Sequence, residues 1–137
     1  MKKLQKAIEF AKEKHKGQKR IFGSTPYIKH PYAVMNLVRR ITKDEDVLCA
    51  AVLHDVIEDC GVKPEELQKL FGKRVTKIVK ELSNNYTPYD KIRSKEALII
   101  KMADSLHNTM EIEGKRKLFY LRRRQRRIRK VFFPDTK

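Results

Sequence analysis

The segment that most constrains this chain is residues 46–59, an apolar run that ends in one histidine and three carboxylates. Its middle reads Val-Leu-Cys-Ala-Ala-Val-Leu, which predicts a helix buried over most of its circumference. His54, Asp55, Glu58 and Asp59 then follow within six residues. A buried charge is costly unless it is neutralised, paired or bound to a metal. The segment therefore predicts a buried helix that carries a polar site.

A metal ion is the first explanation for the polar end of this helix. On an α-helix His54 and Asp55 point about 100° apart, so both can reach one ion. Glu58 lies one turn beyond this pair, and Asp59 lies four residues beyond Asp55. A helix whose last turn emerges into solvent explains Glu58 and Asp59 equally well. It does not explain His54 and Asp55 together, which favours a metal site.

The length and composition predict a single domain over residues 1–137. The 137 residues, 40% of them hydrophobic, are enough for one core. No apolar run approaches the roughly 18 residues of a membrane span, and the first residues are charged and amphipathic, unlike a secretory signal. Cys49 and Cys60 lack metal-site spacing, so we expect reduced core or near-core residues. These features predict a cytoplasmic protein.

The net charge of +16 predicts anionic partners, and nucleic acid, a membrane surface and a phosphorylated small substrate are all open. Ten basic residues and no acidic one lie between Lys115 and Lys130, a segment that predicts a basic helix over about 115–131. We expect this helix to bind nucleic acid weakly and without sequence preference, with an affinity that falls steeply with salt. The alternative is a solvated basic face with no specific partner.

Helical periodicity recurs along the rest of the chain. Apolar spacing predicts helices over residues 2–15, 64–71 and 73–83, and a further buried helix that Ser94 caps. Gly61, just after the polar cluster, is the expected end of the central helix. No period-two run or hairpin turn indicates a strand. We therefore expect an all-α fold, a compact helical bundle.

Two further candidate ligands lie on or at the start of helices. His30 directly precedes Pro31 at a helix start, where a lone histidine is more often a capping or packing residue. Asp104 interrupts an apolar helix, and alone it could pair with one of many lysines or arginines. Together with the His-Asp pair of the central segment they complete the composition of an HD-type metal site. Two imidazoles and two carboxylates suit a borderline divalent ion.

Four ordered motifs resemble the hydrolase domain of the RelA/SpoT alarmone-metabolising family over roughly residues 4–112. They are Arg20-x-x-Gly23, Pro26-Tyr27-Ile28-x-His30-Pro31, Leu53-His54-Asp55-x-x-Glu58-Asp59 and Lys101-x-Ala103-Asp104-x-Leu106-His107-Asn108. The resemblance implies an all-helical HD-domain bundle. It also implies hydrolysis of guanosine tetra- or pentaphosphate at the 3′-pyrophosphate, the reaction of a guanosine-3′,5′-bis(diphosphate) 3′-pyrophosphohydrolase, which gives GDP or GTP and pyrophosphate.

The resemblance also implies a role for individual motif residues. The implied metal is Mn²⁺ or another divalent ion, and its ligands are His30, His54, Asp55 and Asp104. The implied acid/base pair around the attacking water is Glu58 and Asp59. The implied substrate contacts are Arg20 and Asn108.

Two positions depart from the pattern of this family. Ile21 stands where a basic residue is usual, and Met110 stands where the family continues with arginine. A different phosphorylated nucleotide is therefore the nearest rival substrate. A nucleic-acid-binding module on an HD scaffold is the alternative from another functional class. Because no synthetase domain is present, we expect a small stand-alone hydrolase.

Overall fold

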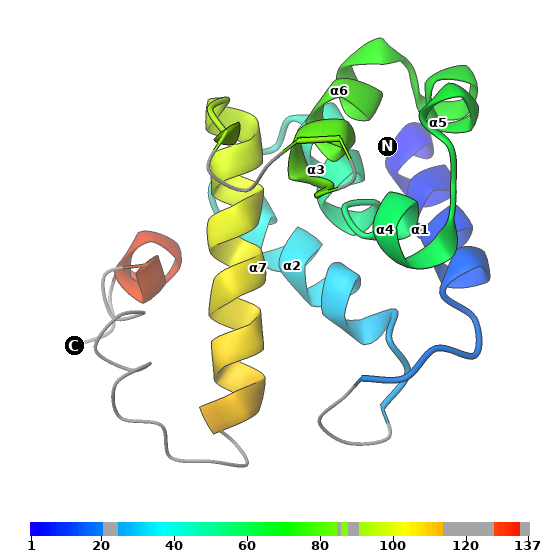
Figure 1. The fold of residues 1–137 in the computed structure, drawn as a ribbon. Helices are drawn as coiled ribbons and strands as arrows, with labels where there is room; N and C mark the ends of the chain where they lie inside the picture. Colours follow the sequence, from blue (N-terminus) through cyan, green and yellow to red (C-terminus); the bar gives the residue numbers. More distant parts are fainter. Residues whose placement is uncertain (21–24, 85, 88–90, 114–127, 135–137) are drawn as a thin grey trace.

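The computed structural model describes residues 1–20, 25–84, 86–87, 91–113 and 128–134, with the backbone alone described at 111–113 (Figure 1). Its helices are α1 Lys2–Lys14, α2 Lys29–Arg39, α3 Glu45–Val52, α4 Val56–Cys60, α5 Pro64–Phe71, α6 Lys73–Leu82 and α7 Lys95–Glu113. Within these parts of the chain, extended backbone pairs only at an isolated antiparallel bridge between Lys19 and Pro26. The expected all-α fold is confirmed.

Helix α3 is the centre of the bundle. All its residues from Val47 to Val52 are buried, because the helix packs against α1, α2 and α6 on different sides. Asp44 caps its start by accepting a hydrogen bond of 3.0 Å from the backbone N–H of Asp46. Helices α2 and α7 pack against each other on one side of α3 (Figure 1). The predicted buried central helix is confirmed over this part of its length.

The central helix is interrupted at the polar cluster, so the prediction of one continuous helix is wrong there. Helix α3 ends at Val52 and α4 begins at Val56, which leaves His54 and Asp55 in a turn. Nδ1 of His54 lies 2.6 Å from the carbonyl oxygen of Ala51. In a continuous α-helix that oxygen would accept from the backbone N–H of Asp55. The imidazole takes the place of a helical hydrogen bond, and this competition turns the chain.

The other helix boundaries follow the sequence signals. Gly61 ends α4 with a φ of 67°, a left-handed conformation that glycine adopts without strain. Ser94 accepts a hydrogen bond of 3.1 Å from the backbone N–H of Ala97 at the start of α7. None of the described helices combines the length and apolarity that a membrane crossing requires. Residues 115–127 of the expected basic helix lie outside the described residues, and its residues 128–131 are helical.

Candidate active site

The turn between α3 and α4 fixes the orientation of His54, whose side chain is 5% exposed. Because its Nδ1 lies 2.6 Å from the carbonyl oxygen of Ala51, Nδ1 carries the hydrogen that this oxygen accepts. The other ring nitrogen, Nε2, faces two carboxylates. It lies 3.0 Å from Oδ2 of Asp55 and 3.5 Å from Oδ1 of Asp104.

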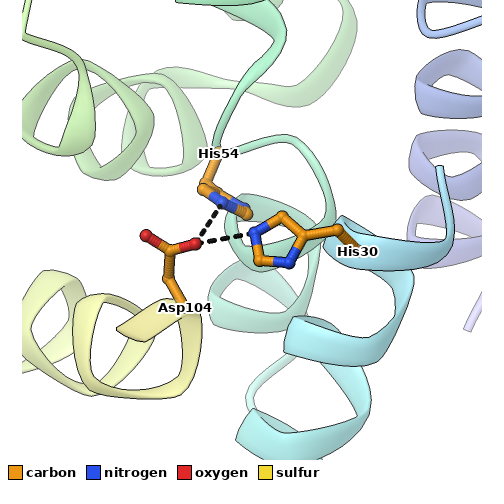
Figure 2. Close-up of side chains that lie close together, drawn as sticks. All are labelled: His30, His54 and Asp104. Atoms are coloured by element: carbon orange, nitrogen blue, oxygen red, sulfur yellow. Dashed lines mark hydrogen bonds and ion pairs between the residues drawn. The ribbon is translucent and has the colours of Figure 1, made fainter. Parts of the chain in front are cut away.

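His30 and Asp104 bring two further helices to the same point. Figure 2 shows the carboxylate of Asp104, from α7, facing the imidazoles of His30 and His54. Nε2 of His30, from α2, lies 2.7 Å from Oδ1 of Asp104. The rings of His30 and His54 meet edge to face with centroids 5.6 Å apart. One ligand atom from each of the three residues lies within 4.8 Å of the other two, so a single ion can contact all three.

The residues of this group fit a divalent cation. Nε2 of His54 is buried and has no hydrogen-bond partner among the described residues, although two carboxylate oxygens lie close to it. A neutral imidazole with a hydrogen on Nδ1 presents a lone pair at Nε2. A lone pair that faces carboxylates is repelled unless a proton or a cation lies between them. Two imidazole nitrogens and a carboxylate oxygen are donors that suit borderline divalent metals.

The electrostatics of this group follow from the same contacts. Burial alone lowers the pKa of His54, but the charges of Asp55 and Asp104 outweigh it and raise this pKa well above its ordinary value. Burial alone raises the pKa of Asp104, but its contacts with His30 and His54 hold it well below the usual range. A cation that binds the group replaces the proton on His54, so metal affinity depends on pH.

Asp55, the fourth expected ligand, lies beside His54. Its Oδ2 accepts a hydrogen bond of 2.7 Å from the hydroxyl of Tyr27 and lies 3.0 Å from Nε2 of His54. Burial raises the pKa of Asp55, but the charge of His54 outweighs it and lowers this pKa to about 2. The three residues whose ligand atoms converge are His30, His54 and Asp104. Metal binding by Asp55 therefore stays a prediction.

Glu58 and Asp59, the expected acid/base pair, lie on α4 and are exposed. The side chain of Glu58 accepts a hydrogen bond from the backbone N–H of Asn84, which orients it. Although Asp59 is exposed as a whole residue, its carboxyl is partly buried, and this partial burial together with the nearby charge of Asp55 raises the pKa of Asp59. A carboxylate with a raised pKa exchanges protons more readily near neutral pH. The arrangement suits proton transfer, and the role itself stays a prediction.

Arg20 and Asn108, the expected substrate contacts, lie together at the edge of the group. A guanidinium nitrogen of Arg20 donates a hydrogen bond of 2.5 Å to Oδ1 of Asn108. Nδ2 of Asn108 lies 3.4 Å from Oδ1 of Asp104, which connects the pair to the candidate ligands. The guanidinium of Arg20 also lies 5.3 Å from the centre of the Tyr27 ring. Arg20 and Asn108 thus lie next to each other and next to a candidate ligand.

Two residues of the site had no assigned role in the sequence. Tyr27 contacts Asp55, and nothing in its glycine- and proline-containing loop predicts that contact. Nδ1 of His107 lies 2.8 Å from Nδ1 of His30, and the two rings stack with centroids 5.0 Å apart. The signal for His107 was its position three residues after Asp104, on nearly the same helix face.

Sequence similarity to known proteins shows the family to which this chain belongs. The HD domain family matches residues 7–118. The chain belongs to the HD-domain family. This HD-domain chain is 35% identical over 132 residues to a guanosine-3′,5′-bis(diphosphate) 3′-pyrophosphohydrolase of Aquifex aeolicus, a match that covers 83% of the chain and 19% of the relative. It is 35% identical over 129 residues to the bifunctional (p)ppGpp synthase/hydrolase SpoT of Escherichia coli K12, a match that covers 79% of the chain and 18% of the relative.

A solved structure shares the fold of the HD-domain chain. It belongs to a metazoan ortholog of SpoT, described as hydrolysing ppGpp and playing a role in starvation responses. The TM-score is 0.74 at 31% identity, over 83% of this chain and 72% of the other. The HD-domain chain spans about a fifth of the length of the two curated relatives, which are matched over 19% and 18% of their residues. The resemblance to the RelA/SpoT hydrolase domain is confirmed, and none of these three proteins is described as binding nucleic acid.

Proposed function

We propose that the HD-domain chain hydrolyses guanosine tetra- or pentaphosphate at the 3′-pyrophosphate. The supporting observation is the convergence of His30, His54 and Asp104 in an HD domain that is similar to proteins named for this reaction. A water oxygen forms a bond to the phosphorus next to the ribose 3′ oxygen, and the bond between that phosphorus and the 3′ oxygen breaks. The products are pyrophosphate and GDP or GTP.

His30, His54 and Asp104 would hold the divalent cation, which we propose to be Mn²⁺, with Asp55 as a further ligand. When bound, the cation supplies positive charge that offsets the charge of the phosphate at which the bond breaks. Neighbouring groups of the chain hold the two histidine ligands in fixed orientations. The carbonyl of Ala51 sets the tautomer of His54, and the ring of His107 packs against His30.

Glu58 and Asp59 would move the protons of the reaction. One carboxylate takes a proton from the attacking water, and the 3′ oxygen of the leaving nucleotide gains a proton. Because the pKa of Asp59 is raised, its carboxyl holds a proton more readily and can donate that proton to the 3′ oxygen. Glu58 is oriented by the backbone of Asn84 and is exposed to the solvent from which water enters.

Arg20 and Asn108 would bind the substrate. A guanidinium donates two parallel hydrogen bonds to a phosphate, which fixes the position of the phosphate as well as neutralising charge. The stacking of Arg20 over Tyr27 supports this role, because it holds the guanidinium plane near the candidate ligands. Asn108 lies one helical turn from Asp104, so its amide can reach a molecule bound at the metal group.

Another phosphorylated nucleotide is the second candidate substrate, because Ile21 and Met110 replace basic residues of the family pattern. A hydrolase for either substrate is expected in the cytoplasm. The free thiols of Cys49 and Cys60 support a reducing compartment.

The decisive experiment is incubation of the purified protein and Mn²⁺ with ppGpp, pppGpp, GTP and ATP, followed by measurement of pyrophosphate and of the nucleotide products. We expect GDP from ppGpp and GTP from pppGpp, with slower reaction of the two triphosphates. Preferred cleavage of a nucleotide without a 3′-pyrophosphate would transfer the proposal to that substrate. Asp104→Asn is the inactive control, and absence of both pyrophosphate release and bound metal would refute the hydrolase proposal.

A further inference from the structure

A hollow is lined by residues of α6 and of the chain that leads into the start of α7 at Lys95. Its volume is about 930 Å³, within the range of small-molecule binding sites. Among the described residues that line it, none belongs to the candidate active site. The hollow is therefore separate from the metal group, and its own chemistry indicates what it can bind.

The hollow is strongly cationic. Its basic lining residues are Lys73, Lys77, Lys80, Lys91 and Arg93. The three lysines of α6 recur at helical spacing, which places them along one face. Among the ion pairs of the described residues, none involves Lys73, Lys77 or Lys91. These ammonium groups can contact an anionic ligand, and the charge of Lys77 also acts on the nearby carboxylate of Glu81.

The acidic residue among the described lining residues is Glu81, and its carboxylate is engaged. Oε2 of Glu81 accepts hydrogen bonds of 2.7 Å and 2.8 Å from the backbone N–H groups of Arg93 and Ser94. These bonds fasten the chain entering α7 to α6. Glu81 thus holds together the two segments that line the hollow. Its single negative charge offsets only part of the charge of the five basic lining residues.

Tyr86 gives the hollow an aromatic surface next to its cations. Its side chain is half exposed, and Nζ of Lys80 lies 5.2 Å from the centre of its ring. The turn is held in place, because the backbone N–H of Tyr86 bonds to the oxygen of Ser83 and the Thr87 hydroxyl donates to the oxygen of Lys80, both at 3.1 Å. An aromatic face flanked by cations binds a base by stacking and phosphates by charge.

We propose that this hollow is a second binding site, separate from the active site, for a free nucleotide that carries two or more phosphates. The phosphates lie against the lysine face of α6, and the base stacks on Tyr86. The turn that carries Tyr86 also orients Glu58, through the backbone N–H of Asn84. The bound nucleotide therefore contacts a segment that is hydrogen-bonded to a candidate acid/base residue.

The test is fluorescence anisotropy of a methylanthraniloyl-labelled GDP titrated with the full chain in EDTA, so that binding does not depend on a metal or on hydrolysis. The charge-reversal pair Lys73→Glu with Lys77→Glu should lower the affinity at least about tenfold, because two cations that face the phosphates become anions. Lys12→Glu with Lys16→Glu is the matched control, with the same charge change at two exposed positions outside the hollow. The control should change the affinity less than about twofold.

Equal losses in the two pairs would overturn the proposal, because they would show general attraction of a basic protein for an anion. Binding that Arg20→Ala abolishes and the Lys73/Lys77 pair leaves intact would assign the nucleotide to the active site and would also overturn it. A melting curve by circular dichroism checks that each variant folds. If the double variant does not fold, Lys77→Gln replaces it, with Lys12→Gln as its control.

The aromatic contact has its own test. Tyr86→Ala should weaken binding of the labelled GDP about fivefold and leave competition by inorganic pyrophosphate unchanged, because pyrophosphate has no base to stack. Tyr86→Phe should bind like the wild type. Equal weakening of both ligands by Tyr86→Ala would contradict base stacking. Binding of a single-stranded RNA decamer that depends on Lys73 and Lys77, without binding of the labelled GDP, would also refute the proposal of a free nucleotide.

Discussion

The hydroxyl of Tyr27 donates a hydrogen bond of 2.7 Å to Oδ2 of Asp55, the same oxygen that lies 3.0 Å from Nε2 of His54. Burial and the adjacent charge of Asp55 raise the pKa of Tyr27, so its hydroxyl keeps its proton and remains a donor. The ring of Tyr27 also packs against Arg20 and meets the ring of His30 edge to face. One side chain thus contacts a predicted substrate-binding residue and a candidate ligand, and it orients the carboxylate of Asp55.

The first prediction concerns this hydroxyl. Tyr27→Phe keeps the ring and removes the donor, so Asp55 loses the bond that fixes its orientation. We expect the affinity for Mn²⁺ to fall about tenfold, as is typical when a partner of a metal ligand is removed. Isothermal titration calorimetry measures it. Tyr32→Phe, which removes the hydroxyl of an exposed tyrosine, is the matched control and should bind Mn²⁺ like the wild type. An unchanged affinity in Tyr27→Phe would show that Asp55 does not need this bond.

The second prediction separates metal binding from proton transfer. Glu58→Gln with Asp59→Asn keeps the size of both side chains and removes their basicity. We expect near-normal metal content and a loss of kcat on the order of 10²-fold or more. His54→Ala or Asp104→Asn should lose metal and activity together, because the first removes a nitrogen donor of the converging group and the second removes the negative charge of its carboxylate.

Metal content by inductively coupled plasma mass spectrometry, measured beside kcat, distinguishes the two sets of variants. If Glu58→Gln with Asp59→Asn loses as much metal as His54→Ala, then the carboxylates of α4 bind the cation and the assigned roles are wrong.

The third prediction concerns Arg20. One nitrogen of its guanidinium donates a hydrogen bond of 2.5 Å to Oδ1 of Asn108, and we propose that the guanidinium also holds a phosphate. We expect Arg20→Ala to raise KM for ppGpp about tenfold through loss of a charge-assisted contact, with unchanged metal content. Arg20→Lys should lower KM only part of the way back to the wild-type value, because an ammonium cannot form the bidentate contact of a guanidinium. Lys19→Ala is the control, since it removes the neighbouring exposed cation. Steady-state kinetics would contradict the role if Lys19→Ala had the larger effect.

The fourth prediction is a pH dependence of the metal-free protein. The folded pKa of His54 is raised above its ordinary value of 6.5. Its protonated form therefore contributes stability that is fully present below about pH 6.5 and is lost as the pH rises through the folded pKa. In EDTA, the free energy of unfolding in urea should fall as the pH is raised above 6.5. His54→Gln should show a smaller fall.

Mn²⁺ should act in the opposite direction, because it binds the neutral imidazole and competes with the proton. We expect added Mn²⁺ to stabilise the protein more at pH 8 than at pH 6, measured by the same urea denaturation. Equal stabilisation at both pH values would show that His54 does not exchange a proton for the metal.

The sequence by itself determined the helices and the residues worth examining. The apolar spacing of α1, α5 and α6 and the caps at Gly61 and Ser94 act over a few residues, so local chemistry decides them. The motif residues His30 and Asp104 were also identified from their unusual surroundings, a helix start and an apolar helix.

Only the tertiary structure decided how these residues meet. The turn at His54 depends on a side chain that takes the carbonyl of Ala51, a competition that a helical repeat does not reveal. Tyr27 reaches Asp55 across 28 positions, and Arg20 reaches Asn108 across 88, because α2, α3 and α7 pack around one core. Periodicity reports which face of a helix is buried, but the packing of distant helices decides which polar groups share that face, and this sets the geometry of the site.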